Sequence, residues 1–122
     1  MADTANLLYE TYKTSGELYL VGDATTAGWD ASAAIKLTES APHIFTITTS
    51  LNAAGGFKFL EVQGQWAPMW GTNDKGNNKK GLLVYRPTEG DADPPSIPAP
   101  SAAGNYLITV DLTTMQYTVE SK

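Results

Sequence analysis

Apolar and polar residues alternate along several short segments of this chain, which is the period of half-buried β-strands. No window of about eleven residues or more shows a convincing helical period. The segments that the alternation or the content of β-forming residues predicts as strands are 17–22, 33–38, 43–49, 57–60, 82–85, 105–112 and 115–120. Short strands separated by turn residues predict an all-β fold, an antiparallel β-sandwich.

The same alternation separates core positions from surface positions. In residues 57–60, Phe57 and Phe59 share one face, and Lys58 shares the other with Leu60. Because two aromatic rings favour the core, Lys58 is expected on the outer face of its strand. Core candidates by this reasoning are Tyr19, Phe45, Phe57, Phe59, Tyr106 and Tyr117.

Two long connections interrupt the strand pattern. Residues 61–81 contain Trp66 and Trp70 and are rich in Asn and Lys, and residues 87–103 are rich in proline. Connections of this length inside a compact domain are usually functional or disordered. Residues 1–16 have no clear period and are expected to be a lead-in or linker, so residues 17–122 are expected to form a single domain.

Composition excludes most reactive chemistry. The 122 residues include no cysteine and one histidine, His43, so thiolate and multi-histidine metal sites are excluded and no cofactor is expected. The net charge of −5 argues against nucleic acid, although Lys75, Lys79 and Lys80 lie close together. His43 opens a strand and no nucleophile elbow is present, so we expect no enzyme.

The acidic residues lie mostly in turns and loops, where solvated side chains are the ordinary interpretation. Two alternatives stay open: a pair of carboxylates for glycoside hydrolysis, which need only meet in space, and a calcium site using Asp91 and Asp93. The stretch that begins at Asp74 resembles a calcium loop only loosely, because its twelfth position is Tyr85 and not Glu.

The aromatic residues favour carbohydrate, since the chain has three Trp and six Tyr against three Phe. Sugar rings have apolar C–H faces that stack on exposed aromatic rings, and their hydroxyls need donors and acceptors at the edges. A neutral glycan does not require net positive charge. The sequence offers this mixture at Trp29, Lys58, Trp66 and Asn105.

Several segments together resemble domains of SusE/SusF-type outer-membrane glycan-binding proteins of Bacteroidetes. They are LYLVGDATTAGW at 18–29, FKFL at 57–60 followed by Trp66, GNYLITVDL at 104–112 and MQYTV at 115–119. FKFL followed by Gly64-Gln65-Trp66, together with Gly28-Trp29, is more distantly similar to glycogen-binding modules related to a kinase β-subunit.

The resemblance implies an immunoglobulin-like sandwich, a carbohydrate-binding module that captures α-glucan such as starch on a shallow surface without catalysis. It implies that Trp29 is the main stacking platform and that Trp66 is a second aromatic wall. Lys58 would donate hydrogen bonds to vicinal hydroxyls, and Asn105 would bind adjacent hydroxyls. Tyr85, Arg86 and Trp70 are weaker candidates that would extend the site.

The resemblance also implies a location and partners. The domain would belong to a cell-surface lipoprotein of the outer membrane, beside a SusC/SusD-like complex, with its signal and anchor outside this chain. Neither a secretory signal nor an apolar run of roughly 20 residues stands in the sequence. The alternative is a structural spacer domain with no ligand, in which Trp29 plugs one end of the sandwich and Asn105 caps a turn.

Overall fold

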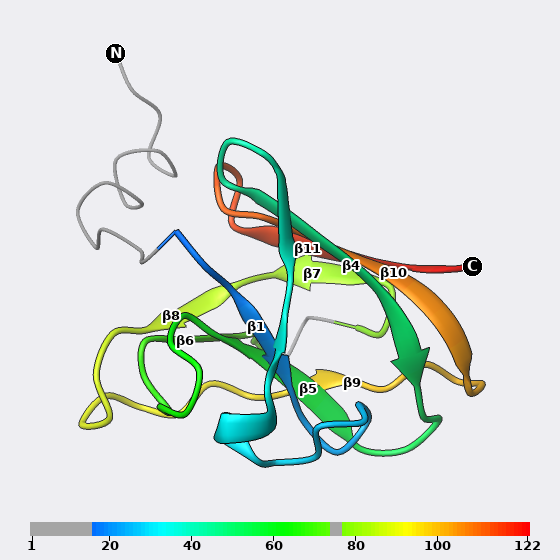
Figure 1. The fold of residues 1–122 in the computed structure, drawn as a ribbon, viewed down its shortest axis with the longest axis horizontal. Coiled ribbons are helices and arrows are strands. Elements are labelled where there is room, and N and C mark those ends of the chain that lie inside the picture. The colour runs from blue at the N-terminus through cyan, green and yellow to red at the C-terminus, as the bar shows by residue number, and fades with distance from the viewer. Residues whose placement is uncertain (1–15, 74–76) are drawn as a thin grey trace.

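The computed structural model describes residues 16–73 and 77–122, which form two antiparallel β-sheets stacked face to face (Figure 1). The predicted all-β sandwich is therefore confirmed. The predicted lead-in, residues 1–16, lies outside the described residues except for Gly16. None of the helices in the described residues is long and apolar enough to cross a membrane.

The first sheet has six strands in the described part of the chain. Its strands run in the order β2-β1-β5-β6-β8, and β9 pairs with the first residues of β5. Their bounds are β1 (Tyr19–Val21), β2 (Ile35–Lys36), β5 (Gly56–Leu60), β6 (Met69–Gly71), β8 (Val84–Arg86) and β9 (Ile97–Pro98).

The second sheet has the order β3-β4-β10-β11-β7. Its strands are β3 (Thr38–Ala41), β4 (Ile44–Leu51), β7 (Lys80–Leu82), β10 (Gly104–Asp111) and β11 (Gln116–Ser121). β10 pairs with β4 over its whole length, and the predicted hairpin with β11 is present.

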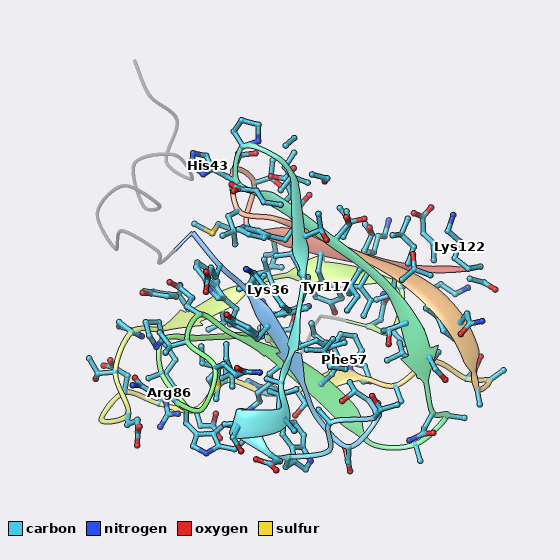
Figure 2. The ribbon with its side chains drawn as sticks, viewed as in Figure 1. Lys36, His43, Phe57, Arg86, Tyr117 and Lys122 are labelled. Carbon is cyan, nitrogen blue, oxygen red and sulfur yellow. The ribbon has the colours of Figure 1, made fainter. Side chains whose placement is uncertain are left out.

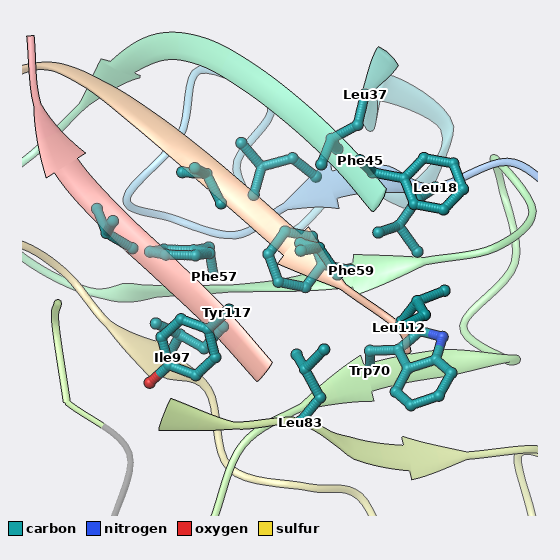
Figure 3. Close-up of a cluster of buried hydrophobic side chains, with 14 of the residues drawn as sticks. Leu18, Leu37, Phe45, Phe57, Phe59, Trp70, Leu83, Ile97, Leu112 and Tyr117 are labelled. Atoms are coloured by element: carbon teal, nitrogen blue, oxygen red, sulfur yellow. The ribbon is translucent and has the colours of Figure 1, made fainter. Parts of the chain in front are cut away.

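The core lies between the sheets and is built from the inward faces that the alternation predicts (Figure 3). Phe57 and Phe59 are 0% exposed and meet edge to face, with ring centroids 5.9 Å apart. The buried core candidates are confirmed at Phe45, Phe57, Phe59 and Tyr117, and Tyr106 packs against them while partly buried. The expectation for Tyr19 is wrong, because its neighbours Leu18 and Leu20 face the core instead.

A second, smaller apolar cluster covers the outer face of the first sheet. It joins Val21, Leu60 and Met69 to two alanines of the segment that contains the short 3-10 helix η1 (Ala31–Ala33). Tyr19 packs against this cluster, which is why it does not point inward. The chain segments around 22–34 and 61–68 thus lie over the outside of the sheet.

Short strands inside the predicted connections are the main difference from the sequence-based expectation. The connection 61–81 contains β6, and the proline-rich segment 87–103 contains β9. The predicted strand 82–85 is divided at Leu83, so that β7 pairs in the second sheet and β8 in the first. These strands pair over two or three residues, too few for a sequence period to reveal.

Candidate functional site

A shallow depression of about 530 Å³ lies on the outer face of the first sheet. Four residues expected at a glycan site, from four separate segments, line it together. Among the described residues, its lining consists of Trp29, Lys58, Trp66, Met69, Arg86, Glu89, Asp93 and Ser96. A surface assembled in this way from distant segments is typical of a binding site built on loops around a rigid scaffold.

Trp29 forms one wall of the depression and is 43% exposed, so it does not plug the sandwich. The turn before it is closed by the hydrogen bond from Gly22 N–H to the carbonyl oxygen of Gly28, at 2.8 Å. After it, Asp30 caps η1 by accepting from the hydroxyl of Ser32 at 2.6 Å and from its backbone N–H at 3.1 Å. The exposed indole therefore projects between two fixed turns.

The same cap lowers the pKa of the carboxyl group next to the indole. The hydrogen bond from the Ser32 hydroxyl, followed by that from its backbone N–H, lowers the pKa of Asp30. The carboxylate beside Trp29 is therefore held in its charged form, which keeps the cap in place.

Lys58 forms the floor of the depression on the face opposite Phe57 and Phe59, as the alternation predicts. Its exposure is lower than expected for an outer-face lysine, since the residue is 7% exposed. The ammonium Nζ lies 2.7 Å from Oδ1 of Asp93 and 5.9 Å from the ring centroid of Trp29. Both are typical stabilising partners of a desolvated ammonium, which also keeps further N–H donors.

Trp66 and Arg86 connect the two sides of the depression. Trp66 packs half-buried against the outer apolar cluster, and its carbonyl oxygen accepts from Arg86 Nη1 at 3.1 Å. The same guanidinium donates from Nη2 to the carbonyl of Glu89 at 2.8 Å and from Nε to that of Asp91 at 3.2 Å. Figure 2 shows Arg86 beside the loop that follows β8. Arg86 thus ties the Trp66 segment to the proline-rich loop.

Replacing Arg86 with lysine is expected to loosen this loop and lower the free energy of unfolding by about 1–2 kcal/mol, since an ammonium cannot match the planar fork that reaches three carbonyls. Amide hydrogen exchange at Thr88 and Asp91 should quicken, while exchange in β10 stays slow. Equal protection of the loop in Arg86→Lys and the wild type would contradict this role.

The proline-rich loop is an ordered wall, held from behind by the first sheet. Thr72 N–H donates to the carbonyl of Pro95 at 2.9 Å, and Ala99 N–H donates to that of Gly55 at 3.0 Å. The loop also passes so close to Gly71 that a Cβ there would lie 2.7 Å from the Pro95 oxygen. These contacts fix Asp93 over Lys58.

Trp70 and Tyr85, two of the weaker candidates, do not line the depression. Trp70 is 1% exposed and faces the core, where its Nε1–H donates to Glu61 Oε2 at 2.8 Å. Its ring lies 4.4 Å from that of Tyr85, which is half-buried against the core. The strand alternation explains this, because Met69, the residue before Trp70, takes the outward position. Trp70 is therefore covered by protein and unavailable for stacking.

Asn105 is also not brought to the depression. It is exposed near the start of β10 in the other sheet, opposite Ser50 of β4, and its carbonyl oxygen accepts from Lys122 N–H at 2.9 Å. An outward amide is predictable from alternation, but the sheet to which the strand belongs is not.

Four of the described lining residues are not predicted as glycan contacts from the sequence: Met69, Glu89, Asp93 and Ser96. The sequence makes Asp93 a candidate only as a cation ligand, together with Asp91. In the structure Asp93 pairs with Lys58, and Asp91 accepts from the backbone N–H and hydroxyl of Thr88 at 3.0 and 2.8 Å. Within residues 16–73 and 77–122, no group of three or more His, Asp or Glu residues is placed to hold a metal ion, and Asp74 lies outside them.

Comparison with known proteins gives one family and one solved structure. The model of the family described as "SusF, first starch specific CBM" (CBM, carbohydrate-binding module) matches residues 13–121. The crystal structure of SusF from Bacteroides thetaiotaomicron is similar, with a TM-score of 0.63 and 17% sequence identity over 87% of this chain. The match covers 24% of that chain, so the present chain spans about a quarter of its length. No curated protein sequence matches.

Proposed function

The chain belongs to the family of the first starch-specific carbohydrate-binding module of SusF, and we propose on this premise that it captures neutral α-glucan, starch above all. Carbohydrate-binding modules are non-catalytic, so the chain is not an enzyme. Its expected part is to hold the polysaccharide, and not to cut it.

One observation carries the proposal: an exposed indole stands beside a buried ammonium in the same depression. The exposed face of Trp29 suits the apolar C–H face of a glucose ring. Lys58, at the floor, has N–H donors left for hydroxyls at the ring edge, and Asp93 beside it has a solvent-facing carboxylate to accept from them. Trp66 lines the same depression, which supports its role as a second stacking wall. Asn105 lies outside the depression, on the second sheet, so we expect it to contact only a glycan that is long enough to reach that sheet.

A spacer domain with no ligand is the competing function. It predicts that Trp29 is buried and that Lys58 is paired away from any open surface. Lys58 is paired, but it lines an open depression under a tryptophan that is 43% exposed. Aromatic residues and arginine are enriched at binding surfaces relative to the rest of a protein's surface, and the depression contains two tryptophans and Arg86, which favours the glycan-binding function.

We place this activity in a cell-surface glycan-uptake system. Residues 17–122 would be one glycan-binding domain of a longer, lipid-anchored outer-membrane protein that works beside a SusC/SusD-like complex. The family and the 24% coverage of SusF support a multidomain protein. An open, shallow site binds weakly by itself, so neighbouring domains would supply avidity.

Native affinity electrophoresis tests the function. The chain should be retarded in a gel that contains amylopectin and should run unchanged in a gel that contains a β-linked glucan. Free migration in several α-glucans would support the spacer domain instead. Release of reducing sugar from amylopectin by the purified chain would contradict the non-catalytic assignment.

Replacing Lys58 with methionine is expected to weaken glucan binding about tenfold, because it removes a charged hydrogen-bond donor while keeping the apolar stem. Asp93 loses its partner but its side chain is 61% exposed, so water can solvate it and the fold should persist. Isothermal titration with a maltodextrin measures the effect.

Lys36→Met is the matched control, since Lys36 lies on β2 of the same sheet, pairs with Glu17 and does not line the depression. A loss of affinity of the same size in both variants would show that Lys58 acts only through overall charge.

A further inference from the structure

The charged side chains of the depression lie at two levels, with the cations held inside and the carboxylates facing solvent. The two cations among the described lining residues are both engaged: Lys58 is 7% exposed and paired with Asp93 at 2.7 Å, and Arg86 donates to three backbone carbonyls. The two carboxylates among the same residues lie outward, since the Asp93 side chain is 61% exposed and Glu89 is exposed on the loop after β8. A ligand that enters from solvent therefore meets negative charge first.

This arrangement has a consequence for an anionic ligand. The charge of Lys58 is already compensated, so an incoming carboxylate or sulfate must compete with Asp93 for it. The exposed charge of Glu89 adds repulsion, and the net charge of −5 on the whole chain has the same sign. A hydroxyl of a neutral sugar bears none of these costs, because it can donate to a carboxylate and accept from the ammonium at once.

We propose that Asp93 and Glu89 make this depression selective for uncharged glycans, by repelling chains that carry carboxylate, sulfate or phosphate groups. This inference rests on the proposed glycan-binding function and adds the residues that set its substrate class. Glu89 suits a test because its side chain can change while its backbone carbonyl still accepts from Arg86.

The experiment compares two probes, a short maltodextrin and the same maltodextrin carrying carboxymethyl groups, by isothermal titration at low salt. Glu89→Lys should raise the ratio of the carboxymethyl affinity to the neutral affinity about threefold to tenfold. Asp93→Asn, which keeps a hydrogen-bonding partner beside Lys58 but removes the charge, should raise the same ratio. The gain should shrink in about 1 M salt, because the charges are exposed and screened.

The matched control is Glu120→Lys, which changes the net charge equally but lies exposed on β11 in the other sheet. Its affinity ratio should equal that of the wild type. The inference is overturned, with the proposed function intact, if Glu89→Lys and Glu120→Lys have the same ratio, or if the wild type binds both probes equally well. If the wild type binds neither probe, the proposed function itself fails and this inference fails with it.

Discussion

Trp29→Ala is expected to weaken α-glucan binding about 30-fold or more, enough to abolish retardation in an amylopectin gel. Truncating a central tryptophan of a binding surface typically costs about 2 kcal/mol or more, and about 1.4 kcal/mol corresponds to a factor of ten. Trp29 is the most exposed aromatic platform of the depression and lies over the Lys58 ammonium at 5.9 Å. Its loss removes both the stacking face and the partial cover of that ammonium.

The effect should come from binding and not from unfolding. Trp29 belongs to neither apolar cluster, so the variant should keep a melting temperature close to that of the wild type. Leu82→Ala is the control, because Leu82 is 49% exposed on β7 in the other sheet and its truncation also removes exposed apolar surface. A folded Trp29→Ala variant that binds amylopectin like Leu82→Ala would contradict the assigned site.

Gly22→Ala is expected to lower the free energy of unfolding by about 3 kcal/mol or more, the range of severe overpacking combined with backbone strain. A Cβ at Gly22 would lie 2.2 Å from the carbonyl oxygen of Gly56 and 2.5 Å from Cα of Phe57. Both are backbone atoms of β5, which β1 and β9 hold from either side. Gly22 also has φ +144°, a conformation that an L side chain rarely adopts. Urea denaturation measures the loss.

Gly64→Ala separates the effect of the steric clash with β5 from the effect of backbone strain. Gly64 has φ +88°, but a Cβ there would meet no atom within 4 Å. Its substitution should cost only about 1 kcal/mol, the strain of the left-handed backbone alone. If both variants lose the same stability, the close approach of Gly22 to β5 does not matter. Because Gly22 begins the turn that closes at Gly28, directly before Trp29, Gly22→Ala should also disturb the depression.

Strand alternation predicts side-chain direction well, and burial much less well. At 57–60 it places the two phenylalanines in the core and Lys58 on the opposite face, as the structure has them. It does not reveal that Lys58 is covered, because the cover comes from Trp29 and from Asp93, which lies 35 residues away in sequence. The same limit applies to Tyr19, which packs under loops that fold over the outer face of the sheet.

Which residues come together in one site depends on which strands are neighbours in a sheet. The strand order of a sheet is not visible in a single sequence. The site residues meet because β1, β5, β6 and β8 are successive neighbours in the first sheet. Lys58 and Arg86 belong to β5 and β8, and Trp29 and Trp66 belong to the segments that follow β1 and precede β6. Asn105 has the residue type and the outward direction expected of a sugar contact, yet β10 belongs to the second sheet.

The central claim, that a glycan stacks on Trp29 over Lys58, is tested most directly by following the three indole N–H resonances of the chain during a maltodextrin titration. The Nε1–H signals of Trp29 and Trp66 should shift and saturate together. The signal of Trp70 should stay in place, because its Nε1–H is buried and donates to Glu61. Saturable shifts confined to the β10 surface around Asn105, with Trp29 and Trp66 unmoved, would contradict the account.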